Sequence, residues 1–101
     1  MLGMGMVALE RIVRFADWAD AIGSWSLEAW NGLLDAMHPS IHRVRNQAGA
    51  KLVANNVASW LAESERTAQP RSYVQDPYSF RCIPQVHGGF TRCRGGRRRC
   101  F

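Results

Sequence analysis

The spacing of apolar residues over positions 1–71 constrains the fold of this 101-residue chain more than any other feature. Apolar side chains recur every three to four positions in three segments, over about 2–21, 26–37 and 47–65. Nothing in this region alternates with the period of two that is typical of a strand. We therefore predict an all-α fold with three helices, followed by a short fourth one.

The residues between these segments predict where each helix stops. Gly23 interrupts the first apolar run, and Ser26 is suited to cap the second helix. Pro39 is expected to end the second helix, because the residue before a proline disfavours the helical region. Pro70 marks the end of the third run. The chain has room for a single domain with a modest core.

The positive charge is concentrated at the end of the chain. Of thirteen Lys and Arg residues, five lie in 91–101, so 1–90 holds eight cations against eight anions. The five are Arg92, Arg94, Arg97, Arg98 and Arg99. An Arg-rich tail could neutralise phosphates, so a basic-tailed nucleic-acid-binding protein is one alternative. It is disfavoured, because the rest of the chain is neutral and predicts no matching basic face.

The cysteines and the N-terminal segment bear on location. Three cysteines without a secretory signal pattern favour a reducing compartment. The apolar start is shorter than the roughly 20 residues that a membrane span needs. We therefore expect a cytoplasmic protein with no membrane association. A zinc site would have to use Cys82, His87, Cys93 and Cys100, which lack a Cys-x2-Cys pair, so no metal is expected.

Other side chains that attract attention are expected to be structural. The four tryptophans, Trp18, Trp25, Trp30 and Trp60, are predicted to pack between helices. His38 and His42 are four residues apart, but the proline between them argues against one continuous helix face for a metal. Cys82 is predicted to pack, since no base is placed to activate it.

The segment 75–90 contains the largest number of neighbouring side chains that could bind a ligand or transfer a proton. It reads Gln-Asp-Pro-Tyr-Ser-Phe-Arg-Cys-Ile-Pro-Gln-Val-His-Gly-Gly-Phe. Asp76 followed by Pro77 predicts a helix start, and the short helix would place Tyr78 and Arg81 on one face. The Ile-Pro pair at 83–84 is expected to end it. An arginine can hold a carboxylate through two hydrogen bonds, and a tyrosine can move a proton. A purely structural alternative has Tyr78 half-buried, Arg81 paired with Asp76 or a glutamate, and Gln75 capping a turn.

The run QDPYSFRCIPQVHG resembles the QDxYSxRCxPQVxG block of the histidine ammonia-lyase family, the aromatic amino-acid lyases and aminomutases. The resemblance covers roughly residues 2–90 and implies a slice of that family's mainly helical fold. It implies that Arg81 binds the carboxylate of an amino-acid substrate such as histidine, tyrosine or phenylalanine. It also implies that Tyr78 acts in proton transfer or helps to activate the electrophile, and that Gln75 hydrogen-bonds substrate or cofactor. His87 falls on a variable position and receives no role.

The resemblance further implies a homotetramer and a methylidene-imidazolone (MIO) prosthetic group made from an internal Ala-Ser-Gly. No Ala-Ser-Gly occurs in the 101 residues. We therefore expect residues 1–90 to be a partial lyase domain that eliminates no ammonia on its own. A non-catalytic helical protein that binds lyase subunits is the other alternative.

The Arg/Cys/Gly-rich tail, 91–101, departs from the small apolar helix that follows the block in the family. We expect this tail to be frameshifted or disordered. Sequencing the locus tests that expectation, because an intact frame with no lyase-like codons downstream would contradict it.

Overall fold

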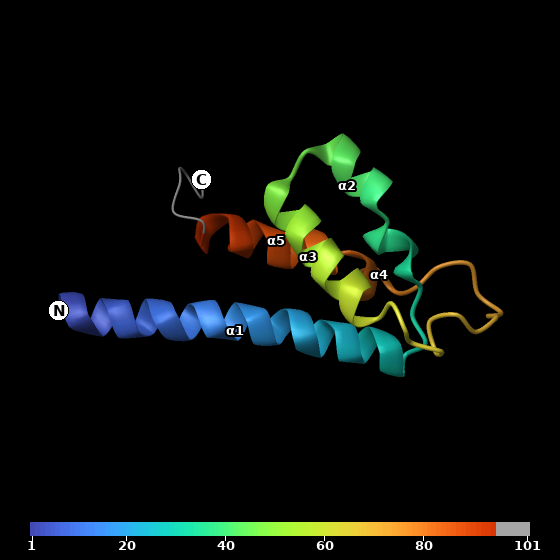
Figure 1. Cartoon of the computed structure of the whole chain (residues 1–101), viewed down its shortest axis with the longest axis horizontal. Coiled ribbons are helices and arrows are strands. Elements are labelled where there is room, and N and C mark those ends of the chain that lie inside the picture. Colours follow the sequence, from blue (N-terminus) through green and yellow to red (C-terminus); the bar gives the residue numbers. More distant parts are fainter. Residues whose placement is uncertain (95–101) are drawn as a thin grey trace.

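A computed structural model describes residues 1–94, and the described residues form helices and turns without a strand (Figure 1). The all-α prediction is confirmed. In chain order, the elements are α1 (Leu2–Ala29), the 3-10 helix η1 (Leu34–Met37), α2 (Pro39–Arg45), α3 (Ala48–Trp60), α4 (Tyr78–Arg81) and α5 (Ile83–Arg94). Among these described helices, none is both long and apolar enough to cross a membrane.

The first helix continues through the predicted break at Gly23. Ser24 and Ser26 do not cap a new helix; their hydroxyls donate to the carbonyls of Asp20 at 2.9 Å and Ile22 at 2.8 Å, inside the same helix. Gly23 faces α5, where an added Cβ would lie 3.4 Å from Ile83 Cδ1. Close packing against α5 therefore offsets the low helix propensity of glycine at this position.

The predicted second helix over 26–37 is wrong. The chain leaves α1 after Ala29, and Asn31 takes the left-handed conformation with φ of 58°. The Gly32 amide then donates to the Leu27 carbonyl at 2.7 Å, which closes the helix end. Only Leu34–Met37 of the expected segment remains helical, as the 3-10 turn η1.

Two prolines that were predicted to end helices do follow helix ends, because η1 stops at Met37 and α4 stops at Arg81. Each of them also begins the next helix, which was not predicted. Pro39 is the first residue of α2, and the ring of His38 accepts a hydrogen bond from the Ser40 amide at 3.3 Å as its cap. Pro84 is the second residue of α5. A proline has no N–H to donate, and the first turn of a helix requires none, so both positions suit it.

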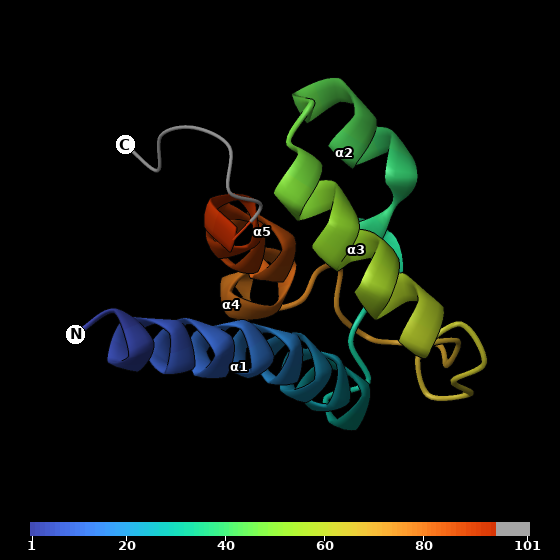
Figure 2. The same cartoon turned by 60° about the vertical axis from the view of Figure 1, so that its left-hand side comes forward.

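The core gathers around α3. Its buried face, with Val53, Ala54 and Val57, meets Leu27 of α1 and Ile83 of α5. Near the start of α3, Gly49 lies against Gly88 of α5, and a Cβ on Gly88 would fall 2.3 Å from the Ala50 amide nitrogen. The two helices therefore meet backbone to backbone at this point. Figures 1 and 2 both show α3 and α5 as neighbours.

The tryptophans do not behave as predicted. All four are more than half exposed. Trp30 makes the one ring contact found among the described residues, with Phe80 at 6.0 Å between ring centroids. The prediction that they pack between helices of this chain is wrong, and their exposure leaves apolar surface uncovered.

The C-terminal helix extends into the predicted tail. Residues 91–94 continue α5, so this part of the tail is not irregular. The remaining tail residues, 95–101, lie outside the described residues. The third helix ends at Trp60 and not near position 65, and the loop 61–77 follows it.

Candidate active site

Asp76 fixes the start of α4 to a distant part of the chain. This residue is only 3% exposed, and its Oδ2 accepts a hydrogen bond from the Leu33 amide at 2.5 Å. Pro77, not Asp76, occupies the N-cap position of α4, and no side chain caps the helix. The capping prediction is therefore wrong, because the carboxylate is committed to the segment between α1 and η1.

The loop before α4 is held by one cation. The Nη2 atom of Arg71 donates to the carbonyls of Gly32, Arg66 and Thr67 at 3.0, 3.2 and 3.1 Å. Three carbonyl acceptors on one guanidinium tie loop 61–77 to itself and to the end of α1. This brace and the Asp76 hydrogen bond together determine where α4 lies.

Arg81 is positioned by the backbone and not by a carboxylate. Its Nε donates to the Asp76 carbonyl oxygen at 3.0 Å, and its guanidinium carbon lies 5.6 Å from the centre of the Tyr78 ring. Within residues 1–94, no Asp or Glu forms an ion pair with it. The structural alternative of an Arg81–Asp76 salt bridge is therefore not realised, and Arg81 has no ion-pair partner within residues 1–94.

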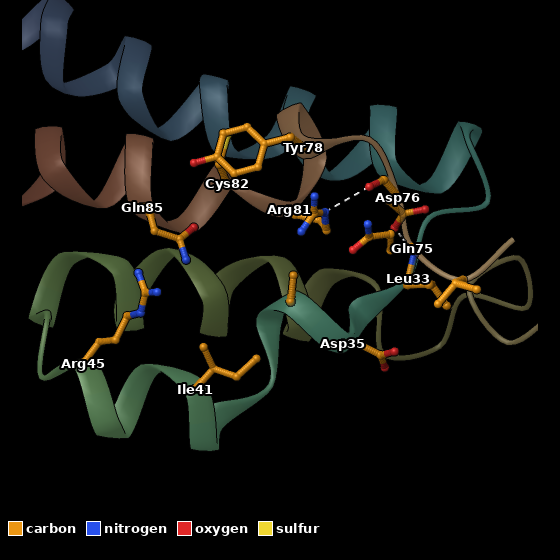
Figure 3. Close-up of a pocket in the computed structure, with 12 residues that line it drawn as sticks. Leu33, Asp35, Ile41, Arg45, Gln75, Asp76, Tyr78, Arg81, Cys82 and Gln85 are labelled. Atoms are coloured by element: carbon orange, nitrogen blue, oxygen red, sulfur yellow. Dashed lines mark hydrogen bonds between the residues drawn. The ribbon is translucent and has the colours of Figure 1, made fainter.

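Gln75, Tyr78 and Arg81 line one hollow of about 410 Å³ (Figure 3). Its opposite wall comes from η1 and α2, through Asp35 and Arg45. Tyr78 is 71% exposed, so its ring stands at the rim and is not half-buried. The structure thus brings all three sequence-predicted side chains to the same cavity.

Two lining residues, Arg45 and Gln85, were not predicted from the sequence. Figure 3 shows their side chains pointing toward one another from α2 and α5. The Gln85 carboxamide is best oriented with its nitrogen donating to the carbonyls of Cys82 and Arg81 at 3.2 and 3.3 Å, which turns its oxygen toward Arg45. Gln85 belongs to the QDPYSFRCIPQVHG run, so its place in that block was the available signal. Arg45 had none, because α2 itself was not predicted.

Tyr73 lies close to Asp76. Its hydroxyl donates to the Asn31 carbonyl at 3.3 Å. Loss of hydration, with the neighbouring Asp76 carboxylate as a second cause, raises the pKa of Tyr73 above its usual value. This phenol therefore stays neutral in the folded chain and serves as a hydrogen-bond donor.

The histidines have structural partners. His42 is buried and its Nε2 lies 3.0 Å from the Ala36 carbonyl oxygen, while His38 caps α2. His87, which received no role from the sequence, lies 2.6 Å through Nδ1 from Oδ1 of the buried Asp20. That pair joins α5 to α1. Its two residues are 67 positions apart in the sequence, so no local sequence pattern could have predicted the contact.

Among the residues that the structure describes, no cysteine belongs to a cluster of metal-binding side chains. Cys82 is partly buried, and its Sγ lies 3.6 Å from the Ser79 carbonyl oxygen. Residues 1–94 contain no group of three His, Cys, Asp or Glu side chains that could hold a metal ion. The zinc alternative also involves the side chains of Cys93 and Cys100, which lie outside what the structure describes.

Comparison with known protein families gives a match to this chain. The family model described as aromatic amino acid lyase matches residues 1–93. The chain belongs to the aromatic amino acid lyase family. The predicted resemblance is therefore confirmed, and it extends over nearly all of the described residues.

Individual relatives of the family are named histidine ammonia-lyase. The relative from Streptococcus pyogenes serotype M6 is 34% identical, and the one from Alkaliphilus metalliredigens is 37% identical, each over 89 residues. The relative from Streptococcus sanguinis is 34% identical over the same length. Each alignment covers 87% of this chain but only 17% or 18% of the relative. No solved structure matches the chain.

Proposed function

We propose that the hollow beside α4 forms one wall of an amino-acid site of the ammonia-lyase type. Arg81 holds the substrate carboxylate, and Gln75 hydrogen-bonds to the substrate. The observation that carries this proposal is the position of Arg81, which lines the hollow with no carboxylate partner in residues 1–94. A guanidinium offers a planar fork of donors that matches a carboxylate, so an amino acid would be both bound and oriented.

Tyr78 acts in proton transfer within this site. Elimination of ammonia breaks a carbon–nitrogen bond and removes a proton from the adjacent carbon, so a positioned acid or base is required. The Tyr78 phenol stands at the rim of the hollow, and the Arg81 cation lies over its ring. A phenol in this position can exchange a proton with a molecule bound in the hollow.

The electrophilic MIO group does not fit this chain taken alone. The group is made from an Ala-Ser-Gly tripeptide, and the 101 residues contain none. When bound in a complete lyase, the ring supplies the electrophile for the amino group; the residues of this chain supply binding and proton transfer. Ammonia-lyase activity on histidine, tyrosine or phenylalanine therefore requires further polypeptide, and we propose that the complete enzyme is homotetrameric and cytoplasmic.

Two assays test the proposal. Purified chain is incubated with L-histidine, L-tyrosine and L-phenylalanine while released ammonia and the absorbance of the unsaturated product are followed. We expect no turnover, and measurable turnover by the isolated chain would contradict the proposed need for further polypeptide.

Calorimetric titration with the same amino acids tests the site itself. Arg81→Lys is expected to weaken binding by at least about tenfold, because lysine lacks the planar fork. The matched control is Arg43→Lys, which changes an exposed arginine of α2 that does not line the hollow. Equal effects of the two substitutions would exclude Arg81 as the carboxylate ligand.

A further inference from the structure

Two arginines line the hollow beside α4, and they come from different elements. Arg81 belongs to α4, and Arg45 is the last residue of α2. Neither of them forms an ion pair among the described residues. Figure 3 shows the two side chains at separate places along the hollow, with Gln85 beside Arg45. The hollow therefore presents two separated cationic groups to a ligand.

The helix dipole does not account for the position of Arg45. A cation in the last turn of a helix interacts favourably with the negative end of the dipole. Arg43 lies in the same turn of α2 and does not line the hollow. Arg43 therefore supplies that interaction already, and the place of Arg45 on the wall of the hollow calls for a separate explanation.

The charges of the lining match an amino acid that carries two carboxylates. The lining also contains two anionic side chains, Asp35 and Asp76. Asp76 is buried and accepts a hydrogen bond from the Leu33 amide, so its carboxylate is already used within the chain. Asp35 is exposed on η1 and forms no ion pair among the described residues. Two cations and one available anion complement two carboxylates and one ammonium group.

The space beyond Arg45 favours a negative charge. A second hollow of about 370 Å³ shares Arg45 and Gln85 with the first one. The described residues that line it include no Asp or Glu. Ala50 also lines it, from the first turn of α3, and the N-terminus of a helix attracts negative charge. A carboxylate beside Arg45 would therefore meet no like charge from this described lining.

Other ligands use the two arginines less fully. A single phosphate would need both guanidinium groups at one point, but Arg45 and Arg81 reach the hollow from different elements and lie apart in Figure 3. An amino acid with an uncharged side chain would gain no charge–charge attraction from Arg45. Two anionic groups at the two ends of one ligand fit the arrangement best.

We propose that the hollow selects an amino acid with an acidic side chain, whose second carboxylate is bound by Arg45. The selection rests on the proposed function, in which Arg81 holds the first carboxylate. The oxygen of the Gln85 carboxamide is turned toward Arg45 and is suited to orient its guanidinium. Arg45 is thus a specificity-determining residue, and Asp35 is the anion available to the ammonium group.

Calorimetric titration with matched acids and amides tests the selection. L-aspartate is compared with L-asparagine, and L-glutamate with L-glutamine, because the members of each pair differ in charge and hardly in size. We expect the acid of at least one pair to bind about fivefold more tightly than its amide, which is the upper range for a partly exposed ion pair. Equal Kd values within both pairs would overturn the proposal.

Variants of α2 test whether the preference comes from Arg45. Arg45→Met is expected to abolish it, and Arg45→Lys is expected to keep part of it because the charge remains. Arg43→Met is the matched control, since it removes one charge from the same turn without changing the lining of the hollow. Far-UV circular dichroism verifies that each variant is folded. A preference that survives Arg45→Met, or that both methionine variants reduce equally, would refute the role of Arg45.

Arg81→Lys separates this selection from the proposed function. It should weaken the binding of an acid and of its amide alike, because both carry the α-carboxylate. If it does so while acids and amides bind equally, the proposed function stands and the selection for an acidic side chain is wrong. If none of the four amino acids binds, both are contradicted.

Discussion

The crossing of α3 and α5 makes a sharp prediction about two adjacent glycines of α5. A Cβ added to Gly88 would lie 2.3 Å from the Ala50 amide nitrogen, 2.4 Å from its Cα and 2.6 Å from the Gly49 carbonyl carbon. All three are backbone atoms, which cannot rotate away. A Cβ added to Gly89 would meet nothing within 4 Å.

The two alanine substitutions should therefore change the free energy of unfolding in opposite directions. Normal contact begins near 3.4 Å, so Gly88→Ala would force the helices apart by about 1 Å. Overpacking of this kind costs about 1–3 kcal/mol or more, and the better helix propensity of alanine returns at most about 1 kcal/mol. Gly89→Ala receives the propensity gain without the clash, so its free energy of unfolding should rise by up to about 1 kcal/mol.

Urea unfolding followed by far-UV circular dichroism measures both effects. We expect a lower midpoint for Gly88→Ala and an equal or higher one for Gly89→Ala. The account of the crossing is refuted if Gly88→Ala is as stable as the unmodified chain, since the helices could then not be in backbone contact.

Two further predictions concern the support of α4. Asp76→Ala leaves the Leu33 amide without its acceptor and should lower the free energy of unfolding by about 1–3 kcal/mol, whereas Asp76→Asn keeps an acceptor and should lower it by less. Chemical denaturation of both variants measures which of the two is less stable. The control is Asp35→Asn, at an exposed position. Because the pKa of Tyr73 is raised in the folded chain, the folded state keeps this proton when the unfolded state loses it near pH 10. Stability contributed by the neutral phenol is thus present below about pH 10 and declines as pH rises through the folded pKa. Phenolate absorbance should show a late transition that Tyr73→Phe removes, and a late transition that persists in this variant would contradict the assignment.

The fold class was predictable from the sequence because apolar spacing reports the buried face of a helix directly. Val53 and Val57, which lie in the apolar segment predicted to be helical over about 47–65, form the core together with Leu27. Helix boundaries were less predictable, because the same residue can end one helix or begin another. Pro39 and Pro84 each follow the end of one helix and lie in the first turn of the next, and only the helix end was predicted.

The candidate site was predictable where its residues are close in sequence. Gln75, Tyr78 and Arg81 belong to one short run and line one hollow. The opposite wall was not predictable, because Arg45 reaches the hollow from a helix that no pattern indicated. The anchoring of Asp76 to Leu33, 43 positions away, depends likewise on the complete fold.

The central claim is that Arg81 binds the carboxylate of an amino acid in this hollow. The most direct measurement is the nuclear magnetic resonance signal of the Arg81 Nε–H during titration with L-histidine and, separately, with histamine, which has the same ring and amine but no carboxylate. Arg81→Lys assigns the signal. The account predicts a saturable shift with L-histidine and none with histamine. An unchanged signal with both, or equal shifts with both, would contradict it.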